Sequence, residues 1–349
     1  MIISAFKYSS VSAKARALFG KLLTKHDYGE LLGKRTVQEI AAYLKKNTFY
    51  SGLLSDINTD LVHRGELEKL FKTSLYGDFI KLLHFIRGSS GEFLKAAFLR
   101  YEVEDLKMLF RIVYTNRENT AIKDSLIFLK KYSRLDFEKL TDSKSIYDVI
   151  SVLKDSEYYK ILSPFLDGSK RINLFDIEMA LDLYFFMTIL KLKDKLLSGA
   201  ERESVTESFG IEIDILNILM IYRCKKLFKF PPELTFKYII PHWYRLSREE
   251  LIRLSQSRDT DEFKRLVSKT KYGELFKDGE EHLWETNSMN YKYRIYKSYL
   301  RRDSYSLGTA LAYLHLKEID IRNIITLIEG VRYSLPKEEI KSYLVGINL

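Results

Sequence analysis

The chain has 349 residues, of which 46% are hydrophobic and 30% are charged, and its formal net charge is +10 at pH 7. This composition excludes a disordered chain and indicates a globular protein of two or three domains with a large buried core. The single cysteine, Cys224, excludes a disulfide within the chain and is predicted to fill a core position.

The first 35 residues are predicted to be helical and to precede the first lobe. Residues 1–7 lack the basic region and the ~7–15-residue apolar stretch of a signal peptide. The most apolar segment, residues 179–192, is interrupted by Asp182 and Lys191 and is shorter than the ~20 apolar residues that cross a bilayer. We therefore expect no membrane-spanning helix.

The rest of the chain is predicted to be helical, because it contains only five prolines and no β-hairpin signal. We expect an N-terminal helix plus a first helical lobe in residues 1–125, a second lobe in 126–232 and a third in 233–349. Pro231 and Pro232 would end the second lobe, and a last helix would begin near Pro336. Residues 87–91, 169–171 and 199–204 are predicted to be turns or loops.

A short acidic motif recurs three times along these segments, about a hundred residues apart. Each copy has an acid, then an acid or amide three residues later, then an aliphatic residue: Glu102 and Asp105, Asp214 and Asn217, Asp320 and Asn323. Nine residues after the first acid, the copies carry Arg111, Arg223 and Glu329. A repeat of this length corresponds to a whole domain, not to a solenoid unit of ~20–50 residues.

A second marker precedes each copy of the motif. It is an acid followed by apolar residues at helical spacing, in Glu39-Ile40-x-x-x-Leu44, Asp148-Val149-x-x-x-Leu153 and Glu262-Phe263-x-x-x-Val267. Each marker leads to a tyrosine, Tyr50, Tyr158 or Tyr272, which lies 52, 56 or 48 residues before the next acid. Two markers in the same order favour a triplicated lobe; the alternative is a chance match in a helical chain rich in Leu, Ile and Tyr.

The second motif copy lies in a segment, residues 211–222, that is apolar nearly all round and is therefore predicted to be a buried helix, with Leu219 in the core. Asp214 and Asn217 share one face of it. An unpaired buried polar group costs ~1–3 kcal/mol, so both need partners. The structural interpretation is that they bind loop backbone groups or a nearby basic residue. Catalysis is the alternative, but no nucleophile or histidine accompanies the motif.

Motifs for common chemistry are absent from the sequence. There is no G-x-x-x-x-G-K-[ST] phosphate loop, no H-E-x-x-H and no G-x-S-x-G. The six histidines are scattered, and one cysteine does not build a zinc site. We expect no cofactor, no metal and a binding or structural role in place of catalysis.

One basic segment, residues 291–302, interleaves four tyrosines with cations, a combination that can bind single-stranded nucleic acid. Its cations are Lys292, Arg294, Lys297, Arg301 and Arg302. Tyr293, Tyr296 and Leu300, however, fall at i, i+3 and i+7, which favours a core-facing stripe with the cations on a solvated face. Nucleic-acid binding remains the alternative.

Several of these motifs resemble the C subunit of archaeal- and vacuolar-type rotary ATPases, which is the d subunit of the vacuolar enzymes. The likeness covers nearly the whole chain. It is carried by residues 306–314 (SLGTALAYL), 316–324 (LKEIDIRNI) and Glu329-Gly330, by 99–107 (LRYEVEDLK), by 212–217 (EIDILN) and more weakly by 13–17 (AKARA).

This resemblance implies an all-α funnel of three similar lobes with pseudo-threefold symmetry. It implies a non-catalytic rotor adaptor that joins the central shaft to the membrane rotor ring, on the cytoplasmic face of the membrane, and transmits torque for ATP-coupled proton or sodium transport. No cofactor and no nucleic acid is expected. Arg301 and Arg302 are hypothesised to grip an acidic shaft tip or the polar loops of the ring. The alternative functions are a general helical scaffold and a basic nucleic-acid-binding protein.

Overall fold

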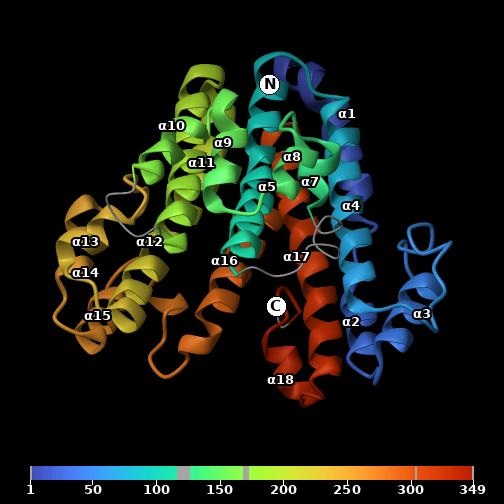
Figure 1. Cartoon of the computed structure of the whole chain (residues 1–349). Coiled ribbons are helices and arrows are strands. Elements are labelled where there is room, and N and C mark those ends of the chain that lie inside the picture. Colours follow the sequence, from blue (N-terminus) through green and yellow to red (C-terminus); the bar gives the residue numbers. More distant parts are fainter. Residues whose placement is uncertain (1, 116–125, 168–172, 303–304, 348–349) are drawn as a thin grey trace. The chain divides into compact units, whose positions relative to one another are not determined.

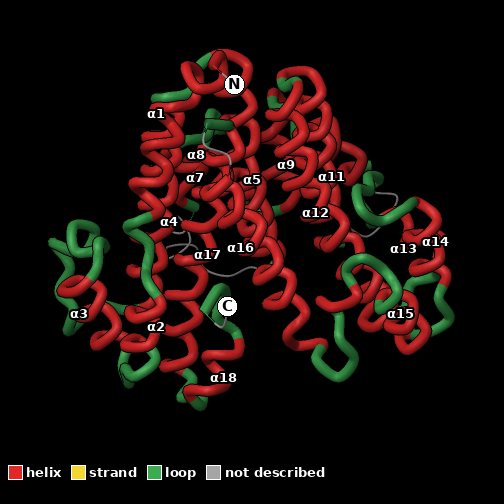
Figure 2. The backbone as a smooth tube through the Cα atoms, turned by 180° about the vertical axis from the view of Figure 1, so that it is seen from behind, coloured by secondary structure: helices red, strands yellow, loops and turns green. Residues whose placement is uncertain are grey.

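A computed structural model describes residues 2–115, 126–167, 173–302 and 305–347. Every regular element in these ranges is a helix, so the all-α prediction is confirmed for the described chain (Figures 1 and 2). The chain divides into two compact units, one of residues 1–86 and 198–349 and one of residues 87–197. These divisions differ from the predicted lobe boundaries after residues 125 and 232, which stay a prediction.

The unit of residues 87–197 is built on two long helices that pack along each other, α5 and α11, with shorter helices against them. Its helices are α5 (Gly88–Tyr114), α7 (Ile127–Lys131), α8 (Phe137–Asp142), α9 (Ile146–Val152), α10 (Tyr159–Leu162) and α11 (Leu174–Leu196). Two short 3-10 turns, Leu153–Asp155 and Ser163–Leu166, flank α10.

The other unit combines the first and last parts of the chain around α17. Its helices are α1 (Ile2–Phe19), α2 (Lys25–Leu31), α3 (Val37–Asn47), α4 (Arg64–Leu83), α12 (Gly199–Arg223), α13 (Pro232–Lys237), α14 (Arg248–Gln256), α15 (Thr260–Val267), α16 (Trp284–Arg302), α17 (Leu307–Arg332) and α18 (Lys337–Ser342). The N-terminal helices α1 and α4 and the later helix α16 all pack against α17 (Figure 1). Segments almost 300 residues apart in sequence therefore share one core.

Three of the short helices, α3, α9 and α15, begin with the same cap. Thr36, Ser145 and Asp259 accept the backbone N–H of the third helical residue, at 3.1, 3.1 and 2.7 Å. That third residue is the acid of the upstream marker, and its carboxylate accepts the N–H of the residue four positions earlier: Glu39 from Arg35 at 2.8 Å, Asp148 from Lys144 at 3.1 Å and Glu262 from Arg258 at 2.7 Å. These bonds satisfy N–H groups that have no partner within the helix, so the acid of each marker stabilises the start of its helix.

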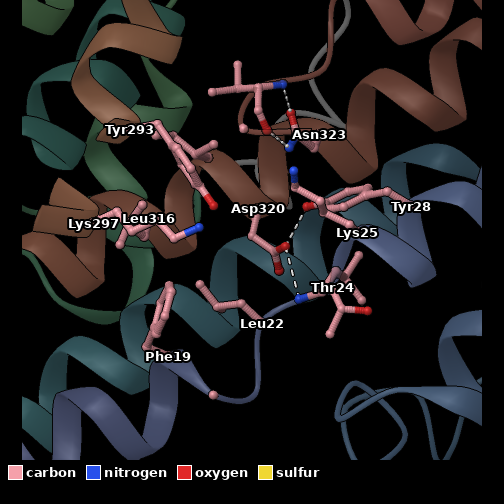
Figure 3. A pocket seen from close by; sticks show the side chains of 15 residues that line it. Phe19, Leu22, Thr24, Lys25, Tyr28, Tyr293, Lys297, Leu316, Asp320 and Asn323 are labelled. Atoms are coloured by element: carbon pink, nitrogen blue, oxygen red, sulfur yellow. Dashed lines mark hydrogen bonds between the residues drawn. The ribbon is translucent and has the colours of Figure 1, made fainter. Parts of the chain in front are cut away.

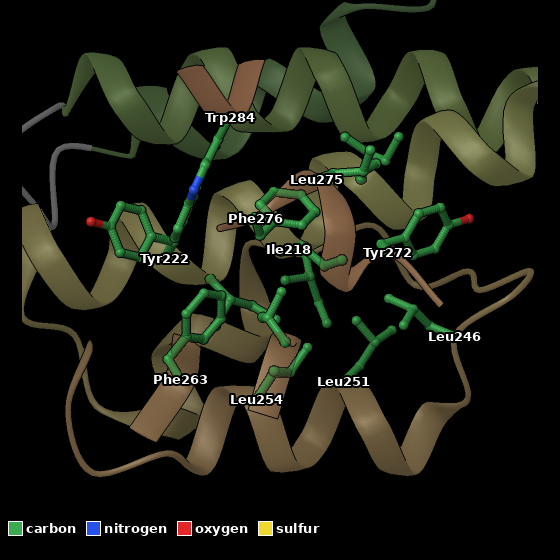
Figure 4. Close-up of a cluster of buried hydrophobic side chains, with 14 of the residues drawn as sticks. Ile218, Tyr222, Leu246, Leu251, Leu254, Phe263, Tyr272, Leu275, Phe276 and Trp284 are labelled. Carbon is green, nitrogen blue, oxygen red and sulfur yellow. The ribbon is translucent and has the colours of Figure 1, made fainter. Parts of the chain in front are cut away.

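Apolar side chains on α12 and on the helices that follow it form one buried cluster (Figure 4). Ile218 is fully buried there, and the Trp284 ring lies 4.6 Å from the Tyr222 ring and 5.3 Å from the Phe276 ring. The Trp284 indole N–H donates to the carbonyl oxygen of Lys277 at 2.7 Å, so this large side chain is buried without an unpaired donor.

The prediction that Leu219 lies in this core is only partly met, because the residue is partly buried and packs at the edge of the cluster. Its neighbour Ile218 takes the central position, because consecutive helical residues point about 100° apart. Cys224 is buried as predicted, and burial raises the pKa of its thiol to about 11.

Two predicted loops are instead helix starts. Residues 199–204 belong to α12 and residues 88–91 to α5. Both helices begin at a glycine with positive φ, 52° at Gly199 and 64° at Gly88. These glycines redirect the chain and let the helix start at once, which sequence alone does not distinguish from a turn. The predicted loop at residues 169–171 lies outside the described residues, and the last helix does begin directly after Pro336.

Candidate functional site

The six polar residues of the recurring motif lie on the long helices α5, α12 and α17, two on each helix. None of their side chains is on the surface: the exposed fraction is 7% for Glu102 and Asp105, 0% for Asp214, 1% for Asn217, 4% for Asp320 and 1% for Asn323. Because burial of an unpaired polar group is costly, the hydrogen bonds that they make define what the motif does.

The first acid of each motif accepts a hydrogen bond from the tyrosine of a marker segment. The hydroxyl groups of Tyr158, Tyr272 and Tyr50 donate to Glu102, Asp214 and Asp320 at 2.7, 2.9 and 2.6 Å. Tyr158 and Tyr272 thus bind the acid that precedes them in the chain, by 56 and 58 residues, whereas the sequence pattern relates each tyrosine to the acid that follows. No copy of the motif precedes Tyr50 in the chain, and this tyrosine instead binds Asp320, the first acid of the last copy.

The second residue of each motif binds the backbone of a segment 22 to 25 residues further along. Asn217 donates to the carbonyl oxygen of Ile240 at 2.9 Å and accepts its N–H at 2.8 Å. Asn323 makes the same pair of bonds with Val345, both at 2.9 Å.

In the first copy the chemistry of this second position differs. Asp105 accepts two N–H groups, from Phe128 at 2.9 Å and from Leu129 at 3.0 Å. An amide both donates and accepts, so it suits one N–H and one carbonyl group, whereas a carboxylate only accepts and suits two N–H groups. The choice of Asn or Asp at this position therefore matches the backbone groups that the side chain binds: one N–H and one carbonyl group for Asn, and two N–H groups for Asp.

The carboxylate of Asp214 is the most heavily bonded of the three acids. Besides Tyr272 it accepts the backbone N–H groups of Tyr244, Arg245 and Leu246 at 3.0, 2.7 and 3.2 Å. Burial raises the pKa of this carboxyl, and the hydrogen bonds partly oppose that rise. Burial and the facing carboxylate also raise the pKa of Tyr272, so this hydroxyl remains a donor.

Asp320 joins the two ends of the chain (Figure 3). Its carboxylate accepts the Tyr28 hydroxyl at 2.5 Å and the N–H of Leu23 at 3.3 Å, in addition to the Tyr50 hydroxyl. One turn earlier on α17, the Lys317 ammonium donates to the Tyr50 hydroxyl at 2.8 Å. Burial raises the pKa of Asp320, and Lys317 together with the two tyrosines opposes the rise.

A cavity of about 260 Å³ adjoins Asp320, between α16, α17 and the two terminal segments. Leu22, Lys25 and Tyr28 line it from the N-terminal side, and Tyr293 and Lys297 from α16 (Figure 3).

The residue nine positions after the first acid makes an ion pair in every copy. Arg111 pairs with Glu178 at 2.6 Å, Arg223 with Glu285, and Glu329 with Arg64 at 2.6 Å. The partners lie near the beginnings of α11, α16 and α4. The third pair has the opposite polarity, so the exchange of arginine for glutamate in the sequence is matched by an arginine on its partner helix.

The structure describes Arg301 and Arg302, the two residues predicted to contact a partner, less fully than the motif residues. Arg301 is exposed near the end of α16, and the side chain of Arg302 lies outside the described residues. On the same helix Tyr296 and Leu300 are buried, as the predicted stripe requires, whereas Tyr293 is only half-buried.

Sequence reasoning missed the partners Arg64, Glu178, Glu285, Tyr28 and Lys317. The first three could have been sought as charged residues near the starts of helices, but Tyr28 and Lys317 carry no recurring pattern. Within the described residues, no group of three or more His, Cys, Asp or Glu side chains could hold a metal ion, and no helix is long and apolar enough to cross a bilayer.

Comparison with known proteins shows which family the chain belongs to. The family model described as ATP synthase (C/AC39) subunit matches residues 11–343. Similar proteins include three that are named as the C subunit of an A-type ATP synthase. The one from Methanosphaera stadtmanae is 24% identical, covering 99% of this chain and 89% of its own. Those from Methanocaldococcus jannaschii and Methanosarcina barkeri are 24% and 26% identical, covering 99% and 97% of this chain and 88% and 93% of theirs. The predicted resemblance is confirmed, and the chain belongs to the ATP synthase (C/AC39) subunit family.

Proposed function

We propose that the chain consists of three copies of one helical bundle. The first would be built on α5 and completed by α9 and α11, the second on α12 with α15 and α16, and the third on α17 with α3 and α4. The support is that three contacts recur in each: a tyrosine on the first acid, backbone groups on the second polar residue, and an ion pair nine residues on. In this proposal the N-terminal segment closes the last bundle, so the bundles are shifted along the sequence relative to the predicted boundaries.

We further propose that the three bundles surround a socket with pseudo-threefold symmetry and that the protein is a rotor adaptor. It would join the central shaft to the membrane rotor ring, on the cytoplasmic face of the membrane, and transmit torque for ATP-coupled proton or sodium transport. The single observation that carries this role is the match of residues 11–343 to the subunit family. Closely packed helices whose buried polar groups are hydrogen-bonded support the adaptor role, because a part that transmits torque must resist deformation.

The adaptor has no catalytic role in this proposal. The three buried acids are engaged by tyrosine hydroxyl or backbone N–H groups of their own bundles. Substituting one of these acids would therefore alter stability and assembly. In this proposal the nucleotide chemistry belongs to other subunits.

The proposal is tested by co-purification of the full chain with the shaft subunits and, separately, with the detergent-solubilised rotor ring. Binding to both is expected. Binding to neither would refute the adaptor role, and binding to one alone would show that the chain does not bridge them.

A second test concerns the C-terminal end of α16, where Arg301 is exposed. If Arg301 and Arg302 contact an acidic partner, the double substitution Arg301→Glu and Arg302→Glu should weaken assembly, and added salt should weaken assembly of the unsubstituted chain. Arg248→Glu, at an exposed position on α14, is the matched control. Unchanged assembly of the double variant would make these arginines ordinary surface residues.

A further inference from the structure

A second cavity, of about 390 Å³, lies between α4, α17 and the turns that follow α1 and α3. Its volume is near the lower end of the range for small-molecule sites, which is ~300–1,000 Å³. Leu18, Leu22 and Leu53 supply apolar walls, and the ring of Phe49, 68% exposed, lies at the same cavity.

The buried cation of this cavity is Lys317, which is 6% exposed. Its ammonium donates to the Tyr50 hydroxyl at 2.8 Å and lies 4.1 Å from the centre of the Tyr50 ring. Among the described residues, no carboxylate forms an ion pair with it at 4.0 Å or less. An ammonium has three N–H donors, so Lys317 retains donors for a further acceptor.

Two other groups at the cavity are also available. The hydroxyl oxygen of Ser74 is buried and has no hydrogen-bond partner within the described part of the chain. The Lys21 ammonium lies 5.6 Å from the centre of the Phe49 ring and has no ion-pair partner in the described residues. Four buried hydroxyl groups lack a partner within the described residues, those of Ser12, Ser74, Thr235 and Ser288, and Ser74 is the one among them that lines this cavity, where a bound ligand could supply its partner.

The lining of the cavity carries a surplus of positive charge. Three lysines, Lys21, Lys81 and Lys317, line it against one acid, Asp78, a balance of +2. Asp78 is already engaged, since it accepts the Tyr313 hydroxyl at 2.6 Å and the Lys81 ammonium at 2.9 Å. Asp320 does not line the cavity but accepts the Tyr50 hydroxyl, and even if its charge is counted the balance is +1.

We propose that this cavity binds a small organic anion, with its charged head at Lys317 and Ser74 and its apolar part against the leucines and Phe49. Lys21, at the exposed side, adds a second cation. The site is separate from the rotor role proposed above and does not depend on it.

The test uses the full-length protein and two probes, benzoate and phenyl phosphate, with benzyl alcohol as the neutral analogue. Saturable binding of at least one anion is expected by calorimetry and by ligand-observed NMR, with a Kd on the order of 1 mM for ligands of this size. The stronger probe identifies the head group as carboxylate or phosphate. No saturable binding of either anion, or equal binding of the alcohol, would overturn the proposal.

Variants locate the binding in this cavity. Lys317→Gln should weaken binding by about tenfold or more, because it removes a charge-assisted hydrogen bond from a buried position. Should this variant fail to fold, Ser74→Ala and Lys21→Gln still decide the question. Ser74→Ala should weaken binding about fivefold and Lys21→Gln about two- to fivefold. Lys269→Gln, at an exposed lysine outside the cavity, is the matched control and should bind as the unsubstituted protein does. Unchanged affinity of the cavity variants would place the probes elsewhere and refute the site.

Discussion

At the scale of single residues, the buried acids act as acceptors that hold distant segments of their own unit together. Each of Glu102, Asp214 and Asp320 accepts a tyrosine hydroxyl at 2.9 Å or less. A hydrogen bond to a charged group contributes ~1.5–3 kcal/mol, and it costs more to leave the acid buried without its donor. The tyrosine also adds a large apolar ring, so one side chain both fills the core and satisfies the acid.

The first prediction concerns Tyr272. Tyr272→Phe keeps the ring and removes one of the four donors to Asp214, so the free energy of unfolding should fall by ~1–3 kcal/mol. Denaturant titration followed by circular dichroism measures the change. Tyr333→Phe, at a tyrosine that is 69% exposed, is the control and should change it by less than ~0.5 kcal/mol. Equal effects would mean that the bond between Tyr272 and Asp214 contributes nothing.

The second prediction exchanges the amide of the second motif for an acid. Asn217→Asp would place a carboxylate against the carbonyl oxygens of Ile240 and His242, to which the amide now donates at 2.9 and 3.2 Å. The expected loss is ~2–4 kcal/mol at neutral pH, and it should shrink in acid, where a protonated carboxyl can donate again. Thermal unfolding at pH 7 and pH 4 tests this; a loss that does not depend on pH would contradict it.

At the scale of elements, capping and core packing make separate contributions. The caps of α3, α9 and α15 are local, because all their donors and acceptors lie within four residues. The long helices α5, α12 and α17 depend on burial instead, since more than half of the residues in each are buried against the rest of the fold.

The cap of α15 provides a prediction about pH. Two hydrogen bonds from Arg258 hold the pKa of Glu262 below the ordinary value of 4.5. The bond from the backbone N–H contributes most, and the bond from the guanidinium group contributes next. A carboxyl whose pKa is lower in the folded state stabilises that state above its unfolded pKa, and this stabilisation is lost as the pH falls through the folded pKa. The stability difference between the protein and Glu262→Gln should therefore be largest above pH 4.5 and should vanish in stronger acid. Urea titrations across this range measure it; a difference that grows in acid would show the opposite linkage.

The core around α12 provides a matched pair of neighbouring positions. Ile218→Ala removes a fully buried side chain and should cost ~2–5 kcal/mol. Leu219→Ala, at a partly buried edge position, should cost clearly less, because less apolar surface is lost and solvent can fill the space. The denaturation midpoints of the two variants measure the two losses of stability. Equal losses would place Leu219 in the centre of the core.

At the scale of the whole molecule, contacts on α17 tie the beginning of the chain to its end. Asp320 binds Tyr28 and Tyr50, and Glu329 pairs with Arg64. Loss of these contacts would release the N-terminal segment without unfolding the region around α12.

Hydrogen exchange can observe this release. In Asp320→Ala, two tyrosine hydroxyls lose their acceptor, so amide exchange should accelerate in residues 23–50 more than in residues 244–272. In Asp214→Ala the pattern should be reversed, because that acid binds residues 244–246 and Tyr272. The two variants are controls for each other, and uniform acceleration in both would mean that the unit opens only as a whole.

The sequence by itself determined the helical class, the family resemblance, the helical spacing in the segments that form α3, α9 and α15, and which polar residues recur. These features depend on interactions within a few residues, such as capping bonds and apolar spacing, so they are visible in a linear pattern. Gly88 and Gly199 show where local reasoning failed, because a glycine that redirects the chain can precede either a loop or a helix.

Only the tertiary structure decided which partners meet. It paired Tyr50 with Asp320, matched Glu329 with Arg64 and brought Lys317 and Ser74 to the lining of one cavity. Tyr50 and Asp320 are 270 residues apart, and their distance in space depends on the path of every helix between them. Such contacts form when the apolar faces of the long helices are buried together, a collective property of the whole core that no single motif encodes.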